Sequence, residues 1–130
     1  MRKPNRKALA RKLQAAVNLY ARLRDCAGQG GCECISCGKW YPFEDLDGGH
    51  FIPTTSSATR YDERNVNAQD RKCNRFLHGN LRNYYEGMKC KWGQKVIDEL
   101  QAQQYVTKKW SIPELRERLE YFEQKIAELS

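Results

Sequence analysis

The chain has 130 residues, of which 40% are apolar, and its net charge is +7 at pH 7. This length and composition suit one domain with a single core and argue against two independent cores. The positive charge favours an anionic partner, for which nucleic acid is the common choice. No stretch approaches the roughly 20 apolar residues of a membrane span, and the basic start does not lead into the apolar run of a secretory signal. We therefore expect a cytoplasmic protein that makes no membrane contact.

A basic helix is the first predicted element. Residues 1–24 contain eight Lys or Arg and no acidic residue. From Asn5 to Arg24 the apolar residues recur at steps of three and four, the spacing of one helical face. The Lys and Arg residues fill the other face, either as a solvated surface or as contacts to phosphate. Glycines at 28–31 end the helix, so residues 1–30 form a first region of basic helix and glycine loop.

The middle of the chain predicts a small β-hairpin followed by helices. Turn-forming residues dominate 32–78, with short extended pieces at about 49–52 and 66–69 separated by a small, polar loop. Helices are predicted from Lys72 onward, near 80–89 and near 93–103. Residues 31–106 are therefore assigned to a central core with its following helices.

The last predicted helix has the clearest start. Ser111, Pro113 and Glu114 combine an N-cap serine, an early proline and a capping-box glutamate. The apolar residues that follow form a seam with steps of 4, 3, 4 and 3: Leu115, Leu119, Phe122, Ile126 and Leu129. Within this third region, 107–130, the seam either packs on the N-terminal helix of the same chain or joins two copies in a homodimer.

The six cysteines predict a structural zinc site. In a reducing compartment they are better interpreted as metal ligands and free thiols than as disulfides. The Cys34-x-x-Cys37 knuckle presents two thiolates to a tetrahedral Zn²⁺, and Cys73 supplies a third. The position three residues before Cys73 holds Asp70, whose carboxylate can complete the site but should bind zinc more weakly than a thiolate. The other candidates for the fourth ligand are Cys32, Cys90 and His78.

Three polar residues near these cysteines predict phosphodiester hydrolysis. Asp47, His50 and Asn74 are of the types that hold a hard divalent cation and activate water for attack on phosphate. In this interpretation neutral His50 takes a proton from water. Asp47 and Asn74 hold one catalytic Mg²⁺ or Mn²⁺, which keeps its other positions for water and phosphate.

Together these motifs resemble the HNH, or ββα-metal, nucleases, especially those of the endonuclease VII type. More closely, residues 34–100 resemble the phage lambda NinG family, also called Rap. The motifs that carry the resemblance are Cys34-Ile-Ser-Cys37-Gly38, Asp47-Gly-Gly-His50-Phe51, Arg64-Asn65-Val66-Asn67, Cys73-Asn74-Arg75 and Gly79-Asn80-Leu81. The expected fold is therefore α+β and mostly helical, with a small zinc-stapled ββα-metal (HNH) core flanked by N- and C-terminal helices.

The resemblance also implies an activity. It implies a structure-selective endonuclease that cuts branched double-stranded DNA, such as Holliday junctions and displacement loops, during phage recombination in the host cytoplasm. His50 would be the general base, and Asn65 would be the middle Asn of the motif, orienting His50 through the neighbouring strand. His78 matches the late His of some HNH motifs, although Asn74 fills the cation role better. Asp70 departs from the family pattern, in which a cysteine is expected.

DNA contacts are expected from basic residues around this site: Arg60, Arg64, Arg71, Lys72 and Arg75. Aromatic residues either stack on exposed bases at a branch point or fill the core: Trp40, Tyr41, Phe51, Tyr84, Tyr85 and Trp92. The competing interpretation is a non-catalytic, zinc-stabilised module for DNA binding or recruitment. A third interpretation, an RNA-directed or ribosome-associated zinc protein, is supported by the positive charge alone.

Overall fold

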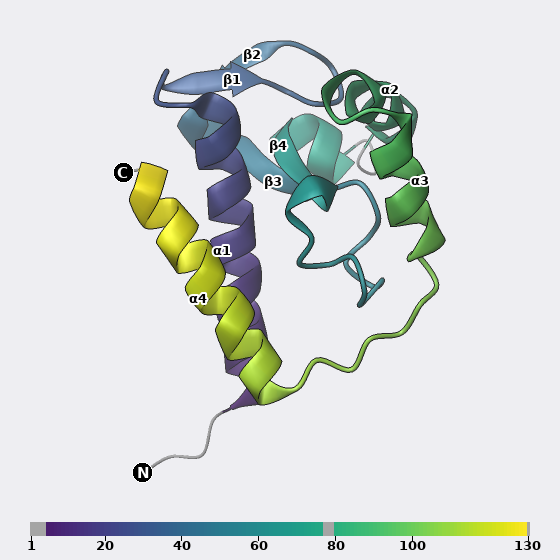
Figure 1. Cartoon of the computed structure of the whole chain (residues 1–130). Coiled ribbons are helices and arrows are strands. Elements are labelled where there is room, and N and C mark those ends of the chain that lie inside the picture. Colours follow the sequence, from purple (N-terminus) through teal and green to yellow (C-terminus); the bar gives the residue numbers. More distant parts are fainter. Residues whose placement is uncertain (1–4, 77–79, 130) are drawn as a thin grey trace.

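The computed structural model, which describes residues 5–76 and 80–129, is mostly helical with two small two-stranded sheets (Figure 1). In chain order the elements are α1 (Arg6–Cys26), β1 (Gly31–Glu33), β2 (Trp40–Pro42), β3 (Leu46–His50), β4 (Val66–Asp70), the short π-helical turn η3 (Lys72–Phe76), α2 (Leu81–Lys91), α3 (Gln94–Ala102) and α4 (Ile112–Leu129). The expected mostly helical α+β class is confirmed. Within the described residues, no helix is both long enough and apolar enough to cross a membrane. The division into regions 1–30, 31–106 and 107–130 stays a prediction.

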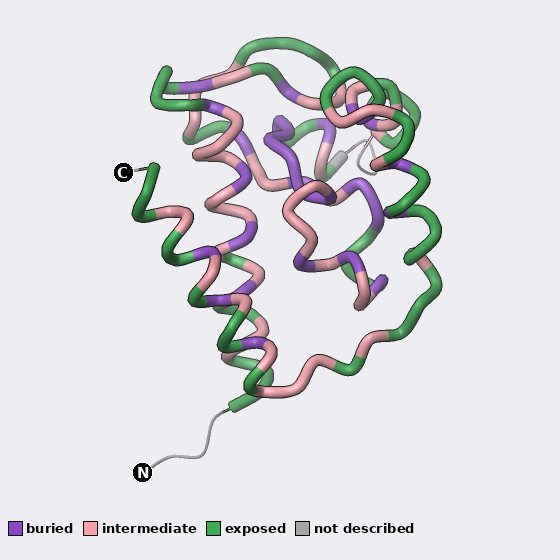
Figure 2. Tube along the Cα trace, in the orientation of Figure 1, coloured by how far each residue is buried: buried purple, intermediate pink, exposed green. Residues whose placement is uncertain are grey.

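The apolar seam of α4 packs on α1 of the same chain, as one of the two alternatives predicted. The two helices lie side by side in Figure 1, and Figure 2 shows buried positions along both. The shared core contains Leu13, Val17, Ala21, Leu115, Leu119 and Phe122. Burying each large apolar side chain contributes roughly 1.5–3 kcal/mol. The homodimer stays a prediction, but most of the seam proposed for it is already covered within the chain.

The start of α4 has the predicted capping box. The Glu114 N–H donates to Ser111 Oγ at 3.2 Å, and the Ser111 N–H donates to Glu114 Oε1 at 3.1 Å. We expect Ser111→Ala to lower the free energy of unfolding by about 1 kcal/mol, because one helix N–H loses its acceptor. Urea denaturation measures this change. Glu117→Ala, at an exposed position of α4, is the control and should change stability by less than about 0.5 kcal/mol. An equal effect of both substitutions would contradict the role of the cap.

The predicted hairpin is present, but its first strand begins earlier than expected. β3 and β4 pair antiparallel, with Asp47 opposite Gln69 and His50 opposite Val66. Gly48 lies against α1, where an added Cβ would meet the Asn18 Cα at 2.8 Å. Gly48 and Gly49 have little strand propensity, so the sequence pattern did not predict a strand at these positions. Because Gly48 has no side chain, the strand can approach the helix this closely. The sequence also gave no sign of the hairpin β1–β2, whose strands have three residues each.

A buried polar network connects α1 to β4 and α2. Asp25 accepts hydrogen bonds from the Lys91 ammonium at 2.6 Å and from the Ala68 N–H at 2.8 Å. Arg24 donates to the carbonyl oxygens of Glu63 and Val66, both at 2.8 Å. Burial opposes ionisation of Asp25, but its bonds to Arg24 and Lys91 hold its pKa below the ordinary value. Arg24 therefore serves the fold rather than the basic surface expected of the N-terminal helix.

Candidate metal centre and active site

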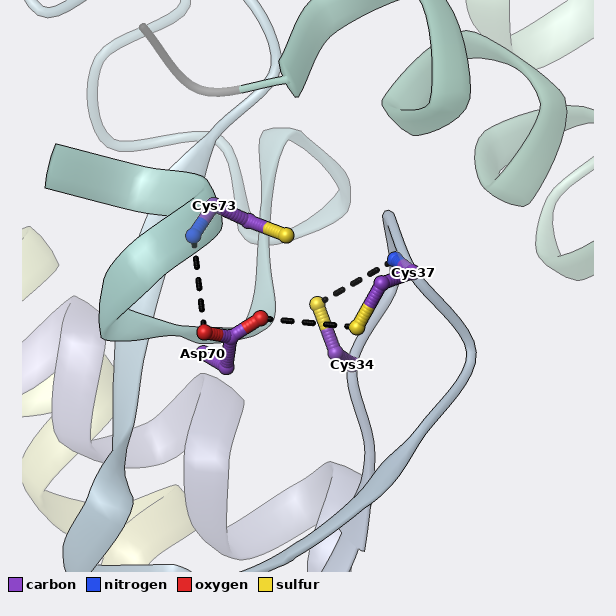
Figure 3. Close-up of side chains that lie close together, drawn as sticks. All are labelled: Cys34, Cys37, Asp70 and Cys73. Carbon is purple, nitrogen blue, oxygen red and sulfur yellow. Dashed lines mark hydrogen bonds between the residues drawn. The ribbon is translucent and has the colours of Figure 1, made fainter. Parts of the chain in front are cut away.

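Three cysteines and one aspartate lie close enough together to hold a single metal ion. The ligand atoms of Cys34, Cys37, Asp70 and Cys73 all lie within 4.8 Å of one another. A tetrahedral Zn²⁺ with Zn–S bonds of about 2.3 Å separates its sulfurs by about 3.8 Å, so the donor set fits zinc. Figure 3 shows two ligands arriving from the knuckle after β1 and two from the end of β4 and the start of η3.

Backbone hydrogen bonds prepare these ligands. The N–H groups of Ser36 and Cys37 point at Cys34 Sγ, at 3.4 and 3.5 Å. The Lys72 N–H donates to Asp70 Oδ1 at 2.8 Å. Burial would raise the pKa of Asp70, but hydrogen bonds from Cys73, Lys72 and Cys37 hold it below the ordinary value. Burial raises the pKa of Cys73 to about 12, so a metal that binds here displaces protons.

The geometry favours Asp70 over the other candidates for the fourth ligand. Cys32 instead pairs with Cys26, whose sulfur lies 3.1 Å away. Cys90 is exposed on α2. Neither belongs to the cluster. His78, the remaining candidate, lies outside the described residues. The zinc identity of the metal and the ligand roles stay proposals.

Asn74 lies beside Asp47. Asn74 follows Cys73 directly on η3, and its Nδ2 donates to Asp47 Oδ2 at 3.0 Å. Arg75 Nε lies 3.2 Å from the same oxygen, and Arg71 Nε lies 3.8 Å from Oδ1. One carboxylate and one amide oxygen are a donor set that Mg²⁺ accepts, once the Asn74 amide turns its oxygen towards the ion. The structure thus brings the two predicted cation ligands into contact.

These residues line an open, positively charged cleft. Its volume is about 320 Å³, and its lining consists of Asn18, Arg22, Leu46, Asp47, Gly48, Arg71, Asn74 and Arg75. Three arginines face one carboxylate, so the cleft carries a net positive charge. This sign suits a phosphate group.

His50 lies in the same strand as Asp47 but makes different contacts. His50 is three positions after Asp47, or about 10 Å along the strand, and this odd spacing points the two side chains to opposite faces. His50 Nε2 lies 3.0 Å from the Arg60 carbonyl oxygen and 3.1 Å from Gln14 Nε2. Burial lowers the pKa of His50 below its ordinary value, and the Arg60 charge adds to this effect while the bond to the Arg60 carbonyl opposes it. His50 is therefore neutral at pH 7, as a general base requires.

Asn65 fixes the backbone beyond His50. Its side chain accepts from the Ile52 N–H at 2.8 Å and donates to the carbonyl oxygens of Ile52 and Thr59, at 3.0 and 3.2 Å. Its own carbonyl oxygen accepts from the Phe51 N–H at 2.9 Å. Asn65 is fully buried and belongs to the turn that enters β4. These contacts fix the two residues that follow His50, and the role of Asn65 in orienting His50 stays a prediction.

The five predicted DNA-binding residues differ in how available their charges are. Arg64 is held by Asp62 at 3.0 Å and Glu99 at 2.5 Å, and these partners raise its pKa. Arg71 and Arg75 share the single carboxylate of Asp47. Lys72 is exposed. The positive charge available to phosphate therefore lies mainly at η3 and Arg60.

The predicted aromatic set divides between core and surface. Phe51 and Tyr84 are buried, and Tyr85 and Trp92 pack against them. Trp40 is 57% exposed on β2, which leaves its ring accessible for stacking. Most of the set is therefore used for packing.

Comparison with known proteins identifies the family. The model of the bacteriophage lambda NinG protein family matches residues 2–130. The chain belongs to the NinG family. NinG proteins of Escherichia phage 933W, Escherichia phage lambda and Salmonella phage P22 are 32%, 31% and 30% identical to it over 120 residues. The aligned part is 92% of this chain but 57%, 56% and 56% of those relatives, so the chain spans little more than half their length. No solved structure matches it.

In this NinG-family chain, α1 contributes residues to the candidate site that sequence reasoning missed. Gln14 contacts His50, and Asn18 and Arg22 line the cleft beside Asp47. These three polar residues recur every four positions and so share one face of the helix. That spacing was the available signal, but the basic residues on the rest of α1 obscured it.

Proposed function

We propose that this NinG-family protein is a metal-dependent, structure-selective DNA endonuclease that hydrolyses phosphodiesters in branched DNA during phage recombination. The main support is the contact between Asp47 and Asn74 at a positively charged cleft. Asp47 lies on β3, the strand that also carries neutral His50. The order β3, β4, η3 agrees with a ββα-metal core in which the cysteine cluster holds η3 against the hairpin.

The hydrogen bonds of His50 suggest which nitrogen acts as the base. Two groups contact His50 Nε2: the Arg60 carbonyl oxygen, which can only accept, and the Gln14 amide nitrogen, which can only donate. We place the hydrogen of neutral His50 on Nε2, towards the carbonyl oxygen, which leaves the Gln14 nitrogen in contact without a hydrogen bond and puts the lone pair on Nδ1. Nδ1 takes a proton from water as the water oxygen bonds to phosphorus. The bond from phosphorus to the 3′ oxygen breaks on the opposite side, and the 3′ oxygen takes a proton from solvent water, which leaves a 5′ phosphate and a 3′ hydroxyl.

Asp47 and Asn74 are the proposed ligands of the catalytic cation. Bound Mg²⁺ or Mn²⁺ supplies positive charge for the leaving oxygen and the phosphate oxygens. Zn²⁺ at the cysteine cluster has the structural role of fixing Asn74.

A second function is favoured by the partners of Asp47. Arg71, Asn74 and Arg75 already satisfy this carboxylate without a cation. Such a site suits a non-catalytic, zinc-stabilised module that binds DNA or recruits a partner. DNA binding without cutting under every metal condition would favour this second function.

The deciding experiment compares a synthetic four-way DNA junction with a linear duplex of the same sequence. Protein stripped of its catalytic cation receives Mg²⁺, Mn²⁺ or neither, while Zn²⁺ is kept constant. We expect cation-dependent cutting of the junction and at least tenfold slower cutting of the duplex. Equal cutting of both would contradict structure selectivity, and cutting without added Mg²⁺ or Mn²⁺ would contradict the need for this cation.

A further inference from the structure

Gln14 links α1 to the two groups nearest the proposed reaction. Its Oε1 accepts a hydrogen bond from Arg60 Nε at 2.9 Å. Its Nε2 lies 3.1 Å from His50 Nε2 and donates to Asn18 Oδ1 at 2.9 Å. The amide is thus fixed at both ends, because one end contacts the loop before β4 and the other contacts its own helix.

Arg60 contacts the His50 imidazole through its backbone carbonyl group, while its side chain bonds to Gln14. Its carbonyl oxygen lies 3.0 Å from His50 Nε2, and its guanidinium lies 5.3 Å from the centre of the Tyr61 ring. Of the described residues, Arg60 is the charged group whose field lowers the pKa of His50. The guanidinium has further N–H donors beyond the one bonded to Gln14, and these suit a phosphate oxygen.

The close approach of α1 to β3 makes this arrangement possible. Gly48 has no Cβ, and an added one would meet Asn18 Cα and Cβ at 2.8 Å. Since Gln14 lies one helical turn before Asn18, it reaches His50, two residues beyond Gly48 in β3. The N-terminal helix is therefore part of the candidate site rather than only its support.

We propose that Gln14 is a positioning residue, which holds the Arg60 guanidinium beside the His50 imidazole so that one DNA phosphodiester meets both groups. This inference rests on the proposed nuclease function and extends it to α1. Gln14 touches no reacting atom. It acts through Arg60, the phosphate ligand, and through His50, the base.

The test reads the His50 titration directly by NMR in wild type, Gln14→Glu and Gln14→Ala. The chain has two histidines, and a His50→Gln variant assigns their signals. Glu is isosteric with Gln and puts a carboxylate against Nε2–H, so Gln14→Glu should raise the pKa of His50 by about 1 unit. Gln14→Ala releases Arg60 and admits water, which moves this pKa towards its ordinary value. Gln101→Glu, an exposed site on α3, makes the same charge change as a control and should leave the titration unchanged.

Junction cleavage gives the second readout. Gln14→Ala should lower kcat about tenfold, as loss of a residue that orients a ligand or base does. In Gln14→Glu, the acid limb of the pH–rate profile should move to higher pH. Titrations identical to wild type in both variants would overturn the inference. If the wild type does not cut DNA but Gln14→Glu still raises the pKa of His50, the proposed nuclease function is wrong while the contact between Gln14 and His50 is supported.

Discussion

Replacing His50 with glutamine is expected to lower the rate of junction cleavage by about 10²–10⁴-fold, the usual contribution of a general base. Glutamine retains a polar side chain but cannot take a proton from water at neutral pH. DNA binding should stay within about threefold of wild type, because the arginines of the cleft are unchanged. Single-turnover cleavage of a labelled four-way junction measures the rate, and a gel-shift assay without added Mg²⁺ or Mn²⁺ measures the binding.

The control for His50→Gln is His78→Gln, the same change at the chain's other histidine. It should retain cleavage within about threefold of wild type. The wild-type rate should rise with pH along an acid limb whose midpoint lies below pH 6.5, because burial lowers the pKa of His50 from that value. Below this midpoint the imidazolium has no lone pair for the proton of water. If His78→Gln abolished cleavage and His50→Gln did not, the base would have to be reassigned.

The sequence predicted local features whose cause lies within a few residues. The helix periods and the capping box of Ser111 and Glu114 depend on short-range chemistry, and the structure contains them. Cys34 and Cys37 were recognisable from their spacing, and Asp70 from its place before Cys73. Their meeting in one cluster required a fold in which the end of β4 lies against the knuckle after β1.

What could not be predicted depends on contacts between distant segments. Gln14 and His50 are 36 residues apart, and no local pattern joins them. Arg24 belongs to the most basic stretch of the chain, yet it binds backbone carbonyl oxygens near β4. Composition describes the total charge of a segment but does not show which charges tertiary structure uses internally. The basic N-terminal helix is therefore both part of the core and part of the candidate site.

Removing zinc is expected to destabilise the whole chain, because the cluster joins the knuckle to β4 and η3. A free zinc concentration a thousand times the Kd stabilises the folded state by about 4 kcal/mol. For a chain of this size that corresponds to a fall in Tm of roughly 10–20 °C when a strong chelator is added. Calorimetry with and without chelator measures the change, and elemental analysis should find one zinc per chain. A Tm that the chelator leaves unchanged would contradict a structural metal.

Substitutions separate the four proposed ligands from the other cysteines. Cys73→Ser should lose zinc, whereas Cys90→Ser, at an exposed position on α2, should keep both zinc and Tm. Asp70→Cys should bind zinc at least ten times more tightly, since a fourth thiolate suits this borderline-soft ion better than a carboxylate. Zinc loss on Cys90→Ser would move the fourth ligand from Asp70 to Cys90.

The Asp70→Cys variant also distinguishes a structural cluster from a catalytic one. Cys73 lies on η3, and the next residue, Asn74, contacts Asp47. If the cluster only holds this geometry, tighter zinc binding should raise Tm and leave the cleavage rate with saturating Mg²⁺ within about threefold of wild type. A rate that changed in proportion to the zinc affinity would instead make the cluster metal part of the reaction.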